Sequence, residues 1–396
     1  MKLFSTARRT NSTWAGHLEA TLPFLDRVDD PFFAEVRRVL EVWFSHYPAE
    51  SRGHLRNRLL GDAERDSHAA SFELLVHEFY WRAGWRAEVE PSIPGTDHRP
   101  DFLWTRCADT MIMEARVVSG LSDEAYRAER RRRALYDAID RMQPHSFYLK
   151  LDIEQDGARQ PPVKTVIAEL ERWLATLDAD AATAALQARP RFDSAPSRRL
   201  EVSGWTLRFA ALPVKPELRG RITGRALGAL PAETKVFDPR IAIRRAMRDK
   251  GGRFGDLEHP YVVALALQEI VVDHDDVRAA LLGDAVATIH GFDATQRPAM
   301  TRERNDNGYW SARRASGRRV SAVLTIEHPR PWTAPRLEPQ LWVNPWASRP
   351  YRAHRLWPWT SLDPTGTQLT FGAAETTAAE LLRLPRDWPP GSPSCS

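Results

Sequence analysis

Three acidic residues between positions 71 and 118 have the types and the order that a metal site requires. Glu73 lies in a segment with helical spacing, Asp101 follows a proline at the start of a short apolar strand, and Glu114 lies within the next apolar segment. Oxygen ligands of this kind suit Mg²⁺ or Mn²⁺, and such a cation activates water in phosphodiester hydrolysis. We therefore expect the three acids to meet at one sheet edge and to serve that chemistry.

The segments around these acids predict one helix followed by three strands. Apolar residues recur at helical spacing from Phe72 onward, after a candidate N-cap at Asp66, and Gly84 ends the helix. Strands are predicted over residues 85–90, 101–104 and 111–118. Side chains alternate along a strand, so Glu114 and Arg116 point to the same face of the third one. A carboxylate and a guanidinium on an otherwise apolar strand are costly to bury without a purpose.

This order of elements resembles the PD-(D/E)XK nuclease superfamily, in which a helix with a glutamate, a strand, a Pro-Asp strand and a Glu-x-Lys strand precede a further helix and strand. The resemblance is carried by Glu73, Pro100-Asp101 and Glu114-Ala115-Arg116. It covers residues 62–155, where the last helix and strand are predicted over 122–142 and 146–153. The resemblance implies an α/β, restriction-endonuclease-like fold with a mixed sheet flanked by helices.

The resemblance also implies a role for each residue of the motif. Asp101 and Glu114 would bind Mg²⁺ or Mn²⁺, with the carbonyl of Ala115 as a further ligand. Glu73 would be an accessory catalytic acid that binds a second metal ion or positions a water molecule. Arg116 would offset the negative charge that develops on the phosphate.

Arg116 is also the position at which the chain departs from the superfamily pattern, which has lysine there. Arginine keeps the charge but is bulkier, stays protonated and presents a planar fork in place of a point charge. The superfamily tolerates other residues at this position, and in some members a lysine from elsewhere takes over. Lys150, on a predicted strand, and Lys250, before Gly251-Gly252, are the candidate substitutes.

A cluster of arginines follows the third strand in the helix predicted over 122–142. Arginines on one face next to a metal site would contact phosphates and give affinity that depends on salt and little on sequence. The equally simple alternative is a solvated face, partly paired with Glu124, Glu129 and Asp137. The cluster consists of Arg127, Arg130, Arg131, Arg132 and Arg133.

Length and composition indicate a protein of several domains. A chain of 396 residues with 42% hydrophobic residues forms two or three domains. We expect an N-terminal helical segment over 1–61, a nuclease-like domain over 62–215, an accessory mixed α/β domain over 216–388 and a flexible tail over 389–396. No apolar run is long enough to span a membrane, the start of the chain lacks a secretory signal, and two cysteines form no disulfide framework. We expect a cytoplasmic protein.

The sequence thus predicts a Mg²⁺-dependent nuclease, with DNA favoured over RNA on the grounds of the resemblance, in bacterial antiviral defence or DNA processing. The net charge of +4 permits nucleic-acid binding without establishing it. One alternative is the same fold with an impaired site, serving as a nucleic-acid-binding or protein-assembly module. Another is a regulator that binds a protein partner, or a second copy of the chain, through a tryptophan-rich C-terminal domain. The simplest alternative is an ordinary α/β core in which Glu114 and Arg116 form a salt bridge.

Overall fold

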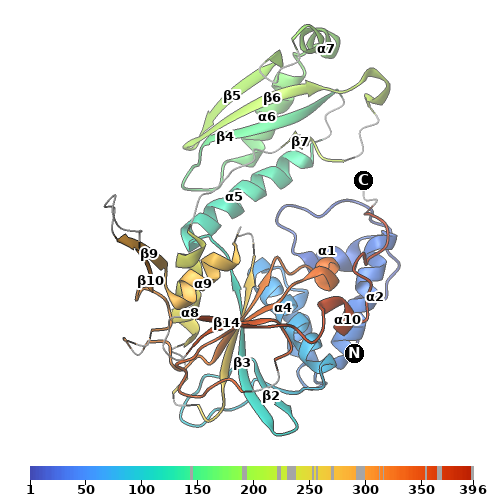
Figure 1. The fold of residues 1–396 in the computed structure, drawn as a ribbon. Helices are drawn as coiled ribbons and strands as arrows, with labels where there is room; N and C mark the ends of the chain where they lie inside the picture. The colour runs from blue at the N-terminus through green and yellow to red at the C-terminus, as the bar shows by residue number, and fades with distance from the viewer. Residues whose placement is uncertain are drawn as a thin grey trace. The chain divides into compact units, whose positions relative to one another are not determined.

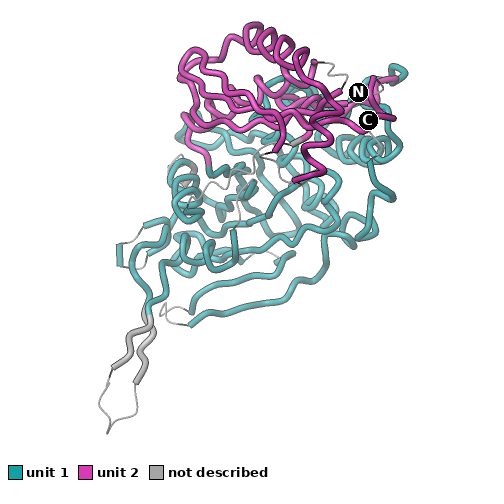
Figure 2. The backbone as a smooth tube through the Cα atoms, turned by 90° about the horizontal axis from the view of Figure 1, so that it is seen from above, with its two compact units in different colours: residues 1–9, 20–120, 237–393 teal, residues 10–19, 121–236, 394–396 magenta. Residues whose placement is uncertain are grey.

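The computed structural model divides the chain into two compact units, which Figure 2 shows in teal and magenta. The first unit contains residues 1–9, 20–120 and 237–393, and the second contains 10–19, 121–236 and 394–396. The structure describes all residues except 143–145, 190–193, 221–223, 230–237, 252–253, 256, 269–271, 291–298, 312, 315, 353–354, 364–367 and 394–396, and it leaves out the side chains of 250–251, 287–290 and 299–303.

The first unit is a mixed α/β structure (Figure 1). Its helices are α1 (Thr21–Arg27), α2 (Pro31–His46), α3 (Arg52–Leu59), α4 (Glu64–Arg82), α8 (Pro239–Gly251), α9 (His274–Leu282), α10 (Ala378–Leu382) and the 3-10 helix η3 (Pro331–Arg336). Its main strands are β1 (Arg86–Val89), β2 (Phe102–Arg106), β3 (Asp109–Val118), β8 (Tyr261–Leu267), β11 (Ala322–Glu327), β12 (Gln340–Val343), β13 (Trp359–Leu362) and β14 (Leu369–Gly372). Strands β9 (Ala285–His290) and β10 (Ala299–Arg304) pair with each other.

The main strands form one mixed sheet in the order β1-β2-β3-β8-β11-β12-β13-β14. Strands β1, β2 and β3 are antiparallel neighbours, and β8 and β11 then continue the sheet parallel to β3. Every residue of β8 is buried, from Tyr261 to Leu267, as expected for a central parallel strand covered on both faces. The α8 segment makes the crossover between β3 and β8, because parallel neighbours cannot be joined by a tight turn.

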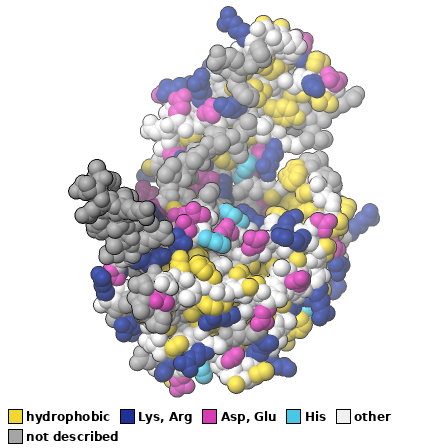
Figure 3. Space-filling model, in the orientation of Figure 1, with side chains coloured by type: hydrophobic (Ala, Val, Ile, Leu, Met, Phe, Trp, Pro, Cys, Tyr) yellow, Lys and Arg dark blue, Asp and Glu magenta, His cyan; other side chains and the backbone are white. Residues whose placement is uncertain are grey.

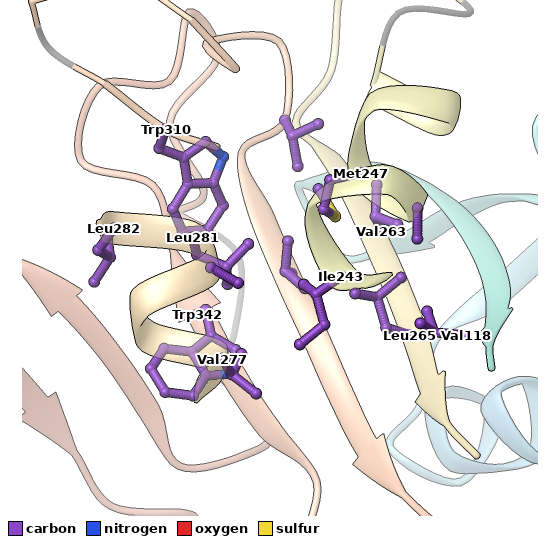
Figure 4. Close-up of a cluster of buried hydrophobic side chains, with 14 of the residues drawn as sticks. Val118, Ile243, Met247, Val263, Leu265, Val277, Leu281, Leu282, Trp310 and Trp342 are labelled. Atoms are coloured by element: carbon purple, nitrogen blue, oxygen red, sulfur yellow. The ribbon is translucent and has the colours of Figure 1, made fainter. Parts of the chain in front are cut away.

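Helices cover the two faces of this sheet around β3. On one face, His77 of α4 lies against Phe102 and Trp104 of β2, with ring centroids 6.0 and 5.5 Å away. The opposite face carries Ile112 and Val118 of β3, which pack in one hydrophobic cluster with the helices α8 and α9. Figure 4 shows this cluster, whose labelled members are Val118, Ile243, Met247, Val263, Leu265, Val277, Leu281, Leu282, Trp310 and Trp342.

The second unit has its own sheet and its own core. Its helices are α5 (Asp123–Asp140), α6 (Val163–Leu174), α7 (Ala179–Ala188) and the 3-10 turn η2 (Pro216–Leu218), and its strands are β4 (Phe147–Gln155), β5 (Ser197–Val202), β6 (Trp205–Pro213) and β7 (Leu227–Ala229). The sheet order is β5-β6-β4-β7. Residues from α5, α6 and these strands form a separate hydrophobic cluster that includes Leu135, Leu151, Leu170 and Phe209.

This arrangement corrects the expected domain boundaries. The predicted helix 122–142 and strand 146–153 exist as α5 and β4, but they belong to the second unit, and β4 pairs with β6 and β7 instead of joining β3. The expected nuclease-like domain over 62–215 is therefore interrupted. The expected separate C-terminal domain over 216–388 is also wrong, because β8 and β11–β14 continue the sheet that β1–β3 begin. The expected tail falls partly on residues 394–396, which lie outside the described residues.

Candidate functional site

Asp101 lies at the point where β2 begins, next to the middle of β3. The register of the two strands starts at Phe102, which is opposite Met113. Just before this pair, Oδ2 of Asp101 accepts a hydrogen bond of 2.6 Å from the backbone amide of Ala115. The Asp101 side chain thus satisfies an amide of β3 beyond the start of the β2 ladder, where a backbone carbonyl would otherwise be required.

The same contact brings Asp101 close to the Ala115 carbonyl and to the backbone of Glu114. The amide and carbonyl of one residue in an extended strand point to the same side, so the carbonyl of Ala115 points toward the Asp101 side of β3. Glu114 is the preceding residue and is buried, with 3% of its surface exposed. Two carboxylates and one carbonyl are therefore concentrated within two neighbouring residues of β3 and the start of β2.

Glu73 has two protein partners that the sequence did not reveal. Its Oε1 accepts a 2.5 Å hydrogen bond from the hydroxyl of Tyr47, and its Oε2 lies 2.7 Å from the guanidinium of Arg58. Tyr47 follows the end of α2 and Arg58 lies in α3, so Glu73 joins three helices of the first unit. Both oxygens of Glu73 are engaged with the protein, which differs from the expected accessory metal ligand.

The electrostatics of this group connect it to Asp101. Burial, reinforced by the carboxylates of Glu73 and Asp101, raises the pKa of Tyr47 well above its ordinary value, so its hydroxyl remains a donor. Burial opposes the charge of Arg58, but Glu73 and Asp101 outweigh it and raise the pKa of its guanidinium. Arg58 therefore places a positive charge next to these two carboxylates.

Arg116 points to the α8 face of the sheet. Its guanidinium lies 3.9 Å from the carboxylate of Asp249 in α8, and 43% of the side chain is exposed. The salt bridge between Glu114 and Arg116, which the alternative of an ordinary α/β core predicts, is not formed in the described part of the chain, where Arg116 pairs with Asp249. An exposed ion pair at this distance contributes little to stability, so Arg116 keeps a charge that solvent or a ligand can reach.

The four residues of the predicted site approach β3 from two sides. Glu73 belongs to α4, which packs on the face formed by Phe102 and Trp104. Glu114 and Arg116 share the opposite face by strand alternation, the face on which Arg116 meets Asp249. Asp101 lies between them, because it bonds to the edge of β3 and also acts electrostatically on Tyr47 and Arg58.

The candidate substitute lysines do not join this group in the described structure. Lys150 lies on β4 in the second unit, where its ammonium is 2.9 Å from the carboxylate of Asp152. Lys250 lies in the last turn of α8, and its side chain is outside the described residues.

The arginine cluster belongs to α5, in the second unit, and part of it is paired with acids there. Arg132 binds the carboxylate of Asp156 and lies 3.9 Å from Glu129, and Arg133 lies 3.4 Å from Glu129. Figure 3 shows basic and acidic side chains interspersed over the face in view. For Arg132 and Arg133 this favours the solvated, paired face over a phosphate-binding one, while a role of Arg127, Arg130 and Arg131 in binding nucleic acid stays a prediction.

The oxygen groups at which the predicted cation would bind are two carboxylates and one carbonyl. Within the described ranges, no three His, Cys, Asp or Glu side chains are gathered so that they could hold a metal ion. Mg²⁺ is commonly bound through one or two carboxylates, with waters and substrate phosphates completing its shell. Binding of a cation by Asp101, Glu114 and the Ala115 carbonyl stays a prediction, whereas a second metal ion on Glu73 would have to displace Arg58 and Tyr47.

Comparison of the chain with known protein families, with curated proteins and with solved structures finds no match. In the part of the chain that the structure describes, none of the helices is long and apolar enough to cross a membrane.

Proposed function

We propose that the chain is a metal-dependent nuclease whose site consists of Asp101, Glu114 and the carbonyl of Ala115. The observation that carries this proposal is the hydrogen bond between Asp101 and the Ala115 amide, which brings the aspartate of one strand to the Glu-x-Arg segment of the next. Two carboxylates at one sheet position are typical of sites that bind Mg²⁺ for phosphodiester hydrolysis.

The order of elements around the site supports the proposed restriction-endonuclease-like fold. Helix α4 with Glu73, strands β1, β2 and β3, helix α8 and strand β8 follow one another in the pattern from which the resemblance was inferred. The second unit is inserted between β3 and α8, and β8 returns to pair in parallel with β3, opposite Glu114 at Val263. Removing the insertion restores the expected sequence of helix, three strands, helix and strand.

The proposed role of Glu73 differs from the one expected, whereas Asp101 and Glu114 keep theirs. Asp101 and Glu114 would hold Mg²⁺ or Mn²⁺, and the cation when bound supplies an activated water and offsets phosphate charge. Glu73, held by Tyr47 and Arg58, balances charge and positions α4 against the start of β2. Arg116, whose side chain is 43% exposed, is a cation that could approach a phosphate from the α8 face.

The proposed substrate is nucleic acid, with DNA ahead of RNA, and the proposed setting is bacterial defence or DNA processing. The proposed substrate and setting are taken from the resemblance. They are the part of the proposal that the site does not carry, because fold similarity by itself does not determine function. Assembly with a protein partner or a second copy of the chain stays a separate prediction.

A second candidate function is a nucleic-acid-binding or assembly module with an impaired site. It is favoured by the engagement of both Glu73 oxygens and by the pairing of Arg116 with Asp249. Such a protein would bind nucleic acid and leave it intact.

A cleavage assay separates the two candidates. The wild-type chain and Glu114→Gln are incubated with labelled single- and double-stranded DNA and RNA, with Mg²⁺, Mn²⁺ or EDTA. The nuclease proposal predicts metal-dependent cleavage by the wild type that EDTA and Glu114→Gln both abolish. Equal binding without cleavage under every metal would favour the impaired module.

A further inference from the structure

A small pocket lies at the carboxyl ends of β3 and β8, on the α4 side of the sheet. Val117 of β3 and Ala266 of β8 form its floor, and α4 contributes Phe72 to its wall. The ends of the strands are tied together here, because the amide of Gln268 donates to the carbonyl of Val118 at 3.0 Å. In sheets with parallel strands, ligands bind in crevices outside the carboxyl ends of the strands.

The polar lining consists of donors and one fixed positive charge. His68 and Ser71 lie three residues apart on α4 and therefore share a face of the helix. Thr21, Gln268 and Arg330 complete the polar lining, and none of the described residues that form the pocket is an aspartate or a glutamate. A pocket with these donors and no carboxylate suits an anion.

Gln268 is the buried group that such an anion would satisfy. Only 5% of this residue is exposed, and its side-chain amide makes no hydrogen bond to another described residue. The polar atoms of this side chain are therefore open to the pocket, where a water or a ligand can bond to them. Because Gln268 lines the pocket, a ligand oxygen there would accept from its NH₂ group.

Arg330 is held in place by the chain on both sides of it. It lies between Pro329 and Pro331, and a residue before proline is restricted to extended backbone, as its φ of -121° and ψ of 146° show. The hydroxyl of Thr333 accepts from the Arg330 amide at 3.2 Å and donates to its carbonyl at 3.1 Å. No acidic partner of Arg330 occurs among the described residues. These contacts fix the backbone of Arg330, whose guanidinium is a donor of the kind that suits a phosphate.

We propose that a phosphate group binds at the mouth of this small pocket, with one of its oxygens inside, near the acidic site of the proposed nuclease. Val117, which lines the pocket, is two residues beyond Ala115 on the same edge of β3, about 6.6 Å along the strand. The inference rests on the proposed function for the origin of the phosphate, which is either an internal phosphodiester or a terminal phosphate of the strand.

Titration with inorganic phosphate in EDTA, followed by calorimetry, tests the pocket without any cleavage. Arg330→Gln should weaken phosphate binding about tenfold or more, since a charge-assisted hydrogen bond is lost. Arg336→Gln, on the exposed side of η3, removes the same charge outside the pocket and should bind like the wild type. Gln268→Glu, which adds a negative charge to the lining, should also abolish binding, and melting curves confirm that each variant is folded.

Repeating the titration with short oligonucleotides that carry a 5′-phosphate or a 5′-hydroxyl identifies the source of the phosphate. A requirement for the 5′-phosphate indicates a terminal group, and equal, Arg330-dependent binding of both indicates an internal one. The proposed phosphate site would be wrong if folded Arg330→Gln binds phosphate with wild-type affinity. It would also be wrong if Arg330→Gln and Arg336→Gln lose the same amount of phosphate affinity, even in a chain that cleaves DNA. Arg330-dependent phosphate binding without any cleavage would support the phosphate site and contradict the nuclease proposal.

Discussion

The carboxylate of Asp101 lies 2.6 Å from the backbone nitrogen of Ala115 and accepts its hydrogen bond. This contact gives Asp101 two functions that can be separated. It completes the hydrogen bonding of β3 where β2 has not yet begun, and it brings one carboxylate next to Glu114.

Asp101→Asn should separate these two functions. The asparagine oxygen can still accept from Ala115, so stability should stay within about 0.5 kcal/mol of the wild type, while loss of the charge should abolish metal-dependent cleavage. Asp101→Ala should lose cleavage and also about 1–2 kcal/mol of stability, because the Ala115 amide loses its partner. Urea denaturation of both variants measures the difference, and equal stability of the two would show that the hydrogen bond is not needed.

Removal of Glu73 should act on folding more than on chemistry. Glu73→Ala leaves the partly buried Arg58 without its carboxylate and Tyr47 without its acceptor, so we expect a loss of about 2 kcal/mol or more. Glu88→Ala, at an exposed position of β1, is the matched control and should change little. A double-mutant cycle of Arg58→Ala and Glu73→Ala should give a coupling of about 1–3 kcal/mol. Unchanged stability combined with lost cleavage would restore Glu73 to a catalytic role.

Removal of Arg116 should act on cleavage more than on stability, the opposite of the result expected for Glu73. Because its ion pair with Asp249 is long and exposed, Arg116→Ala should cost less than about 1 kcal/mol of stability. If it approaches the phosphate, the same change should remove most of the cleavage, and Arg116→Lys should retain it. Lys150→Ala, which affects a lysine paired with Asp152, is the control for the migrated-lysine hypothesis. Full activity of Arg116→Ala with loss in Lys150→Ala would contradict this assignment.

His77 should make stability fall with acidification. Burial, with a smaller effect from His46, lowers the pKa of His77 to about 3. The unfolded chain, with a His pKa of about 6.5, therefore binds more protons, and stability present above pH 6.5 is lost as the pH falls toward 3, by up to about 1.4 kcal/mol per pH unit. His77→Phe, among Tyr47 and Trp104, should flatten this part of the curve relative to the wild type.

The control for this pH dependence is the exposed His98. Denaturation of the wild type, His77→Phe and His98→Gln at several pH values between 4 and 7 makes the comparison. His98→Gln should reproduce the wild-type slope. A wild-type slope in His77→Phe would assign the acid sensitivity to other groups.

The local elements around the site could be predicted from the sequence, whereas their long-range partners could not. The helix ending at Gly84 and the three strands occur close to their expected bounds, because they follow from apolar spacing and turn residues within a few positions. The strand that pairs with β3 lies more than a hundred residues further along the chain, and local patterns carry no signal for such pairing. The expected core contains the nearer strand over 146–153 instead, since consecutive strands are usually neighbours.

The same limit explains the site residues that were missed. Tyr47 and Arg58 precede Glu73 in separate helices, and nothing in their spacing indicates that they converge on one carboxylate. Gln268 and Arg330 meet only because β8 and β11 end side by side, as the hydrogen bond from the His328 amide to the Leu267 carbonyl shows. The order of acids was visible in the sequence, but their protein partners depend on tertiary structure.

The location of bound manganese tests the central claim most directly. Crystals soaked in Mn²⁺ and measured for anomalous scattering should show a peak within about 2.0–2.6 Å of carboxylate oxygens of Asp101 and Glu114 and of the Ala115 carbonyl. The peak should disappear in Asp101→Asn and Glu114→Gln. A saturating soak without density at these three groups, or with density elsewhere in a chain that cleaves DNA, would contradict the proposed site.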